Sequence, residues 1–275
     1  MDSMKPRLLT AAIGIPAGIL LLLLGEFFHG LIFIVVGALC AIMIVEFLAA
    51  KKLQKNMKVF IPCVLYAFVQ PTLFHFKLGM LTPYLFILAI FVMMIIFHDE
   101  ISFSDAAFAI LGTIIIVFGM TSMLIVPNSL HGYFSLFIVI TLTIPWFSDG
   151  GAYFTGVFLG KHKLCTNISP KKTIEGFAGG IVTGIICALA IALVFNAISH
   201  TAKLNVGLMI LLGAVVTIVA VVGDLSFSLV KRSCDIKDFG SFFPGHGGVL
   251  DRFDSVIFTA PIVYFMVKFL PLFII

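Results

Sequence analysis

Four aspartates of this chain have the residue type and the setting to bind a metal ion together with phosphate. Asp149 and Asp224 lie toward the ends of apolar segments, and Asp251 and Asp254 open the last apolar segment. A carboxylate inside a membrane segment costs about 2.5–3.5 kcal/mol on insertion scales, so it usually marks a functional site or a buried partner. Carboxylate oxygens suit hard cations, above all Mg²⁺ with phosphate. We therefore expect up to four carboxylates to converge near one membrane surface.

Each of these aspartates also has a simpler interpretation when it is considered alone. Asp149 or Asp224 could serve as a proton relay or as a helix-packing contact. Asp254 could cap the last apolar segment, with Ser255 beside it. Asp251 and Asp254 are three residues apart, so they share one helix face if the helix begins before them.

Glu46 is the remaining carboxylate inside an apolar segment. It lies close to the basic edge that begins with Lys51 and Lys52. The sequence favours a structural role in which Glu46 pairs or snorkels at that edge. The basic stretch 51–58 itself is typical of a topology signal. On this interpretation Glu46→Gln is expected to be mild.

Two polar stretches, 160–176 and 229–254, carry the cations that could neutralise phosphate charge. Their basic residues are Lys161, Lys163, Lys171, Lys172, Lys231, Arg232, Lys237 and Arg252. The second stretch includes "GHGG" at 245–248, where glycines allow backbone N–H groups to approach a phosphate closely. His246 within it could be a loop residue, a phosphate contact or an acid. A lysine-rich stretch such as 160–176 can also be only a topology signal, and "GHGG" a plain turn. Carboxylates surrounded by cations are nevertheless typical of a site that binds metal and phosphates together, and such a site at a membrane surface can hold a metal nucleotide against a lipid headgroup.

The elements that must position these residues are apolar helices. The chain is 61% hydrophobic and 11% charged, with a mean hydropathy of +1.21, whereas soluble domains are about a quarter charged. The apolar runs are continuous and do not alternate, which favours helices over barrel strands. This predicts an all-α polytopic integral membrane protein with a single transmembrane domain, 1–275. Nine segments are expected: 8–25, 30–50, 59–76, 79–98, 106–126, 132–153, 177–198, 206–228 and 255–275.

Two of these segments have unusual sequences. The segment 59–76 is the weakest, because Pro62, Gln70, Pro71 and His75 interrupt it. The segment 132–153 ends in "PWFSDGGAYFTGVFLG", whose proline, aspartate and glycines are expected to break the helix.

The lysines and arginines predict the orientation of the chain. With a cytoplasmic N-terminus and an external C-terminus, 14 of them fall on the cytoplasmic side and 3 on the other. The three external ones are Lys77, Lys203 and Lys268. This split places 160–176 and 229–254 in the cytoplasm, so the expected metal and phosphate site lies at the cytoplasmic surface of the membrane.

The residues 228–254, "SLVKRSCDIKDFGSFFPGHGGVLDRFD", resemble the signature of the phosphatidate cytidylyltransferases, or CDP-diacylglycerol synthases. The matching residues are Ser228, Lys231, Arg232, Lys237, Asp238, His246, Gly247, Gly248, Asp251, Arg252 and Asp254. The segment 149–180 is similar to the upstream pattern of that family, with Asp149, Lys163, Ser169, Pro170, Lys171, Lys172, Thr173 and Glu175 in place. One mild departure is Gly150-Gly151, where relatives often carry a Thr-Gly pair. Residues 1–130 match only as generic membrane helices, so 131–275 is the expected catalytic part.

The resemblance, to the prokaryotic type of the family, implies a Mg²⁺-dependent reaction of CTP with phosphatidic acid that gives CDP-diacylglycerol and pyrophosphate. It implies that the protein is embedded in the lipid bilayer of the cell (inner) membrane, with its active site facing the cytoplasm. It also implies a homodimer, and no nucleic acid partner is expected. Asp224 and Asp251 are the expected catalytic Mg²⁺ ligands, and Asp149 and Asp254 would be further ligands or lie behind them. Lys172 is expected to act in catalysis and substrate binding. The other expected substrate-binding residues are Lys171, Ser169, Ser228, Lys231, Arg232, Lys237, His246, Gly247, Gly248 and Arg252.

Two other classes share some of these ingredients. One is another membrane transferase of nucleotides to lipid phosphates, including alcohol phosphotransferases that consume CDP-diacylglycerol. The latter resemble D-x-x-D-G-x-x-A-R, but "DRFDS" has serine in place of the glycine and no Ala-Arg follows. The other class is a transporter with Asp149 and Asp224 on its pathway. No internal repeat of broken helices supports that class.

Overall fold

A computed structural model describes residues 29–76, 78–125, 132–242 and 247–274 of the chain. The chain divides into two compact units. Unit 1 consists of Met1–Leu124 and Ser233–Phe253, and unit 2 consists of Ile125–Arg232 and Asp254–Ile275. Unit 1 therefore combines the generic first half of the sequence with most of the signature segment 228–254.

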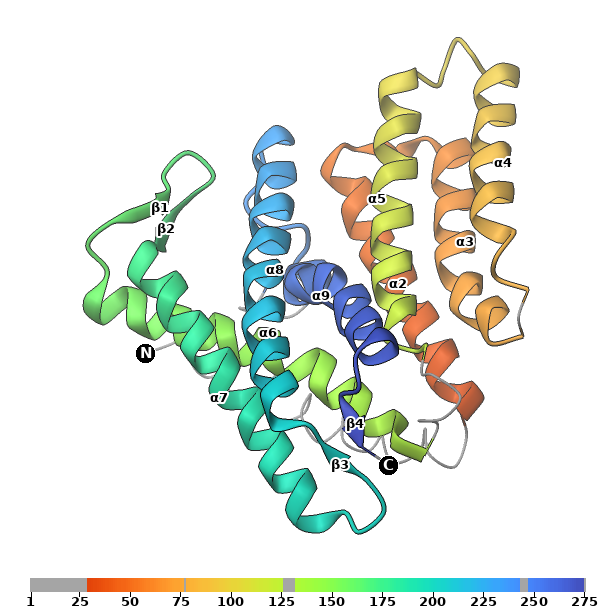
Figure 1. The fold of residues 1–275 in the computed structure, drawn as a ribbon. Helices are drawn as coiled ribbons and strands as arrows, with labels where there is room; N and C mark the ends of the chain where they lie inside the picture. Colours follow the sequence, from red (N-terminus) through yellow and green to blue (C-terminus); the bar gives the residue numbers. More distant parts are fainter. Residues whose placement is uncertain (1–28, 77, 126–131, 243–246, 275) are drawn as a thin grey trace. The chain divides into compact units, whose positions relative to one another are not determined.

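Unit 1 is built on four apolar helices that pack side by side (Figure 1). These are α2 (His29–Ala50), α3 (Met57–His75), α4 (Thr82–Ile96) and α5 (Phe103–Ser122), with the short 3-10 helix η1 (Leu53–Lys55) between the first two. α2 contacts α3 and α5, and α4 also contacts both α3 and α5. α2 and α3 approach so closely that a side chain at Gly37 would overlap the carbonyl group of Phe68.

The helix α3 continues through both of its prolines, although the sequence indicates an interrupted segment. Its start is capped by Asn56, whose side chain accepts the Lys58 N–H at 3.2 Å. The polar Gln70 does not break the helix, because its amide donates to the Gly79 carbonyl at 2.9 Å and accepts from the Thr82 hydroxyl. Tertiary hydrogen bonds thus satisfy the polar group that weakens this segment in the sequence.

Unit 2 consists mainly of four helices and two short antiparallel strand pairs. In chain order these are α6 (Phe134–Leu159), β1 (Lys163–Cys165), β2 (Ser169–Thr173), α7 (Ile174–Ile198), β3 (Lys203–Leu204), α8 (Val206–Ser233), α9 (Leu250–Phe269) and β4 (Phe273–Ile274), with α9 entering unit 2 at Asp254. β1 pairs with β2 and β3 pairs with β4. The core gathers Phe137, Ile144, Ala188, Val216 and Val263, one or more from each helix.

Glycines allow α6, α7 and α8 to approach closely. A Cβ at Gly180 of α7 would lie 3.2 Å from the Ser148 carbonyl oxygen of α6. A Cβ at Gly213 of α8 would lie 2.7 Å from the Gly184 carbonyl oxygen of α7. Small residues at helix crossings are the usual packing device inside membranes, where apolar burial from water does not drive helix association.

The helix break that the sequence predicts after residue 144 is absent from α6. The helix runs without interruption through Pro145 and the glycine pair as far as Leu159. A side chain at Gly151 would overlap Thr183 of α7, so this glycine serves helix packing rather than a turn. Asp149 consequently lies within a continuous helix.

Six helices of the described residues are long and apolar enough to cross a membrane: α2, α3, α5, α6, α7 and α8. α4 has 15 residues, about 22 Å at the usual rise, against a hydrocarbon core of about 30 Å. α9 is not among the six, since its first two turns carry Asp251, Arg252 and Asp254. The expected segment 8–25 lies outside the described residues. A mostly helical, multi-pass membrane architecture is confirmed, whereas the count of nine and the sides of the membrane stay predictions.

Candidate active site

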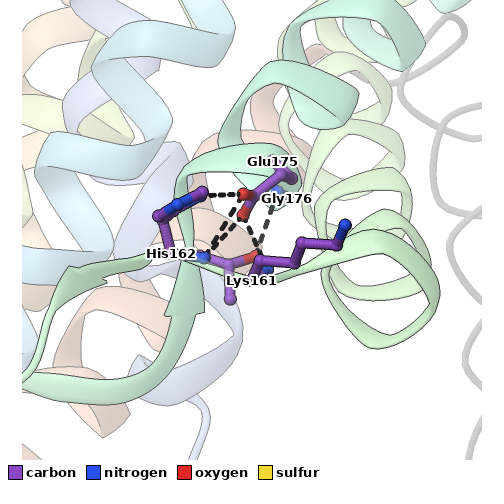
Figure 2. A network of polar contacts seen from close by, with 5 residues as sticks. Lys161, His162, Glu175 and Gly176 are labelled. Atoms are coloured by element: carbon purple, nitrogen blue, oxygen red, sulfur yellow. Dashed lines mark hydrogen bonds and ion pairs between the residues drawn. The ribbon is translucent and has the colours of Figure 1, made fainter.

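The polar connection 160–176 is a hairpin whose base is closed by Glu175. This side chain, in the first turn of α7, accepts the backbone N–H groups of Lys161 at 3.1 Å and His162 at 3.2 Å, and it contacts His162 Nδ1 at 2.6 Å (Figure 2). Thr173 caps α7 by accepting the Gly176 N–H at 3.1 Å. The hairpin is therefore fixed at both ends, and β2 carries Ser169 and the lysine pair directly to the start of α7.

Lys172 and Asp224 form an ion pair between β2 and α8. Both side chains are about one quarter exposed, so the pair is accessible from outside unit 2. The structure thus brings together two of the three expected catalytic residues. An ammonium group beside Asp224 also means that this carboxylate faces a position that a cation can occupy. Lys171, the preceding residue on the strand, is exposed.

Asp149 and Asp254 meet at Ser255. The Ser255 hydroxyl donates to Asp149 Oδ2 at 3.3 Å, and the Ser255 backbone N–H donates to Asp254 Oδ1 at 2.8 Å. Asp254 also lies within electrostatic reach of Asp224 and Lys231. Three of the four expected aspartates therefore occupy one region of unit 2, with lysines beside them. The contact of Ser255 with Asp149 was not expected from the sequence.

The last turns of α8 supply three of the expected substrate-binding residues. Ser228 and Lys231 are both buried, and they lie three residues apart on the same side of the helix. Arg232 is exposed, with its Nε 3.5 Å from the Ile168 carbonyl oxygen in the hairpin. Basic residues also suit the negative end of a helix dipole, so position alone does not assign them to substrate.

Asp251 organises the signature loop in unit 1. One of its oxygens, Oδ2, accepts the backbone N–H of Phe239 at 2.8 Å and that of Gly248 at 3.1 Å. Gly247 has a φ of +83°, a left-handed conformation that favours glycine. A Cβ on Gly247 would lie 3.3 Å from Asp251 Oδ2 and 3.6 Å from Asp238 Oδ1, so both aspartates border this glycine. The described residues on both sides of this loop, Phe239 and Gly248, therefore donate to the same Asp251 oxygen.

The start of α9 decides between two interpretations of its aspartates. The helix begins at Leu250, before either aspartate, so Asp251 and Asp254 share a face as expected. The alternative that Asp254 caps the helix is wrong, because Asp254 lies one turn inside it. Lys237 and Arg252 are both exposed, and His246 lies outside the described residues.

The interpretation of Glu46 from the sequence is wrong. The carboxylate does not pair at the basic edge: it accepts the backbone N–H groups of Val249 at 3.0 Å and Leu250 at 2.8 Å. Lys51 instead pairs with Asp105 of α5 at 2.7 Å. Buried N–H donors outcompete an exposed lysine for this carboxylate, since exposed ion pairs gain little in water. The signal available in the sequence was the carboxylate itself, inside an apolar segment.

Within the described residues, no three histidine, cysteine or acidic side chains form a ready-made metal site. The available oxygen donors nevertheless suit a hard cation that keeps most of its shell for water and phosphate. Which aspartates hold Mg²⁺ stays a prediction.

Comparisons with known proteins agree with the signature. A model of the cytidylyltransferase family matches residues 5–270. A phosphatidate cytidylyltransferase of Bacillus subtilis (strain 168) is 32% identical over 97% of this chain and 98% of its own length. Proteins of the same name from Staphylococcus haemolyticus (strain JCSC1435) and Staphylococcus aureus (strain COL) are 36% and 38% identical, each over 60% of both chains. The match extends over nearly the whole sequence, and the chain therefore belongs to the cytidylyltransferase family.

Proposed function

We propose that this chain transfers the CMP group of CTP to phosphatidic acid and releases CDP-diacylglycerol and pyrophosphate. Family membership and the name of the full-length relative support this reaction. The observation that carries it is the contact of Lys172 with Asp224, because it places a phosphate-binding cation beside a carboxylate of the apolar helix α8. Such a site suits a substrate that is both a lipid and a phosphate.

The chemistry is an in-line displacement at phosphorus. An oxygen of the phosphatidate phosphate attacks the α-phosphorus of CTP, and the bond to the β-phosphate oxygen breaks as pyrophosphate leaves. A phosphate monoester is already ionised at neutral pH, so no protein nucleophile is needed. Both reactants are anions, and catalysis is therefore mainly charge neutralisation and positioning.

The basic residues of unit 2 are suited to this positioning. When phosphate arrives, Lys172 can exchange its contact with Asp224 for a contact with a phosphate oxygen. Lys171 and Arg232 are exposed near the same hairpin and can bind further oxygens of the triphosphate or the lipid headgroup. Burial and the neighbouring Asp224 raise the pKa of Asp254, and the positive charge of the buried Lys231 partly offsets this effect.

Mg²⁺ is the cation that these donors fit, since carboxylate and hydroxyl oxygens are the ligands it prefers. We propose that Asp224 and Asp251 hold it, with Asp149 and Asp254 as further ligands or as their support. When bound, it would neutralise charge on the phosphate oxygens. The local settings support these roles: Asp224 already has a cation beside it, and Asp251 is held by two backbone N–H groups.

Purified protein in detergent, supplied with Mg²⁺, labelled CTP and phosphatidate, tests the function. We expect pyrophosphate release that requires both substrates, and a labelled lipid product. Polyprenyl phosphate in place of phosphatidate should give no product. Efficient transfer to polyprenyl phosphate would instead identify another membrane transferase of nucleotides to lipid phosphates. Ion flux in liposomes without CTP turnover would identify a transporter.

We further propose a multi-pass protein of the cell (inner) membrane, with its active site toward the cytoplasm and a homodimeric assembly. The distribution of lysine and arginine supports the orientation, and the family resemblance supports the dimer.

The orientation predicts how two cysteines react in intact cells. Cys165 lies in β1 and Cys234 follows α8, and both are partly exposed, whereas Cys40, Cys63 and Cys187 are buried. A membrane-impermeant thiol reagent should label Cys165 and Cys234 only after the cells are permeabilised. A His200→Cys variant, exposed beside Lys203, should be labelled without permeabilisation. Labelling of Cys165 or Cys234 in intact cells would contradict the proposed orientation of the chain in the membrane.

A further inference from the structure

Glu46 of α2 reaches a part of the sequence more than two hundred residues away. Its carboxylate is buried, with 8% of the residue exposed. The Val249 N–H donates to Oε1 at 3.0 Å, and the Leu250 N–H donates to Oε2 at 2.8 Å. Each oxygen therefore has its own backbone donor inside unit 1.

These donors belong to the start of α9. The first N–H groups of a helix have no partner within the helix, and a nearby side chain usually caps them. Here the cap comes from another helix, and its negative charge suits the positive end of the α9 dipole. Glu46 thus fixes where α9 begins and in which direction it starts.

Two glycines of the segment 228–254, Gly240 and Gly248, leave space for the Glu46 carboxylate because they have no side chain. A Cβ at Gly248 would lie 2.6 Å from Glu46 Oε2, and a side chain at Gly240 would also overlap the carboxylate. Neither glycine has a positive φ, in contrast to Gly247. Gly240 and Gly248 are therefore explained by the volume of Glu46 rather than by backbone conformation.

The contacts of Glu46 continue directly into those of Asp251. Three consecutive N–H groups are shared between the two carboxylates: Gly248 donates to Asp251, and Val249 and Leu250 donate to Glu46. A shift of this backbone would move Asp251, which is the next residue. Glu46 and Asp251 consequently hold consecutive residues of one short turn.

We propose that Glu46 is a positioning residue for the transfer reaction: it anchors the turn 248–250 so that Asp251 is held in place for the metal-bound substrate. This inference rests on the proposed function. Glu46 acts through the backbone of the loop, because its oxygens are both engaged by N–H groups and are enclosed by glycines. The apolar first half of the chain thereby contributes directly to the site.

Glu46→Gln in the full-length protein tests this role. Glutamine has one carbonyl oxygen, so its amide N–H₂ would face a backbone N–H and one hydrogen bond would be lost. We expect the Mg²⁺ concentration that gives half the maximal rate to rise about tenfold or more, as for the loss of one charged hydrogen bond. Glu100→Gln is the matched control, since Glu100 is an exposed partner of Lys58 in the same unit and should leave this value unchanged.

Two readouts separate positioning from a general effect on folding. The half-saturating Mg²⁺ concentration does not depend on how much of the sample is folded. Amide hydrogen exchange of the turn 248–250 needs no substrate, and it should accelerate in Glu46→Gln but not in Glu100→Gln. If Glu46→Gln does not purify, Glu46→Asp keeps the charge on a shorter side chain and should show the same two changes.

A loss of activity in the Glu46 variants with unchanged Mg²⁺ dependence and unchanged exchange at the turn would overturn the proposal. Wild-type behaviour in both readouts would do so as well. Absence of CTP turnover in the wild-type protein would instead refute the proposed function, while the exchange measurement would still report on the contact of Glu46 with the loop.

Discussion

Asp251→Asn and Asp224→Asn should each lower kcat by about two to three orders of magnitude, the usual cost of removing a central electrostatic group. The physical reason is loss of charge at nearly constant volume. At Asp251 one oxygen accepts both backbone N–H bonds, so the asparagine carbonyl can keep them and the loop should stay folded. At Asp224 the substitution also removes the partner of Lys172. Steady-state kinetics at saturating Mg²⁺, with thermal unfolding as a check on folding, measures the effect.

The control for these substitutions is Asp105→Asn. Asp105 makes a partly exposed ion pair with Lys51, and such pairs contribute about 0–1 kcal/mol to stability. Its activity should be close to that of the wild type. Near-normal turnover in both Asp224→Asn and Asp251→Asn would exclude these two residues as metal ligands. Glu46→Gln cannot serve as a neutral control, because Glu46 contacts the loop that contains Asp251.

Lys172→Ala is expected to lower kcat/KM by about ten- to a hundredfold, the effect of losing one charged hydrogen bond to substrate. Lys172 lies two residues before α7, where unpaired N–H groups and the helix dipole already favour an anion. A lysine at this end does not stabilise the helix, and its partner in the structure is Asp224. Because we propose that Asp224 binds the metal, we expect Lys172 to contact a substrate phosphate during the reaction. Part of the loss should appear in the KM for CTP or phosphatidate.

Lys51→Ala and Lys52→Ala are the matched controls for Lys172→Ala. Both lysines lie in the basic stretch 51–58, which we interpret as a topology signal. Lys51 forms an ion pair with Asp105 and donates a hydrogen bond to the Ser104 hydroxyl. Steady-state kinetics on the three variants separates site chemistry from bulk charge. Equal, modest losses in all three would mean that the lysines act only through the surface potential.

The helices were predictable because apolar length is a local property of the sequence. All eight expected segments that fall within the described residues contain a helix. The details that failed depend on tertiary contacts. α6 continues through Gly151, which packs against Thr183, and α3 continues through Gln70, whose amide has partners at Gly79 and Thr82. Without knowledge of such tertiary contacts, proline and polar residues in a sequence predict a helix break.

The parts of the candidate site that could be predicted are those whose side chains have a characteristic residue type and spacing in the sequence. Asp224 and Lys172 were expected to cooperate and are in contact. Glu46 was assigned to the wrong partners because its real ones are backbone N–H groups, which leave no residue type to recognise. The glycines that admit its carboxylate look, in the sequence, like ordinary turn residues.

Unit 1 consists of two stretches that are far apart in the sequence, so it cannot be completed early in synthesis. Glu46 pairs with donors 203 and 204 residues further along the chain, so ribosomal synthesis must be nearly complete before this contact can form. Closing so long a loop is entropically costly and slow. Until then the Glu46 carboxylate of α2 lacks its two backbone N–H donors, and an unpartnered carboxylate is a costly group in an apolar helix. Unit 1 is therefore completed late, although most of its helices are made first. A chain that stops before residue 250 retains a destabilised membrane helix that a quality-control protease could recognise.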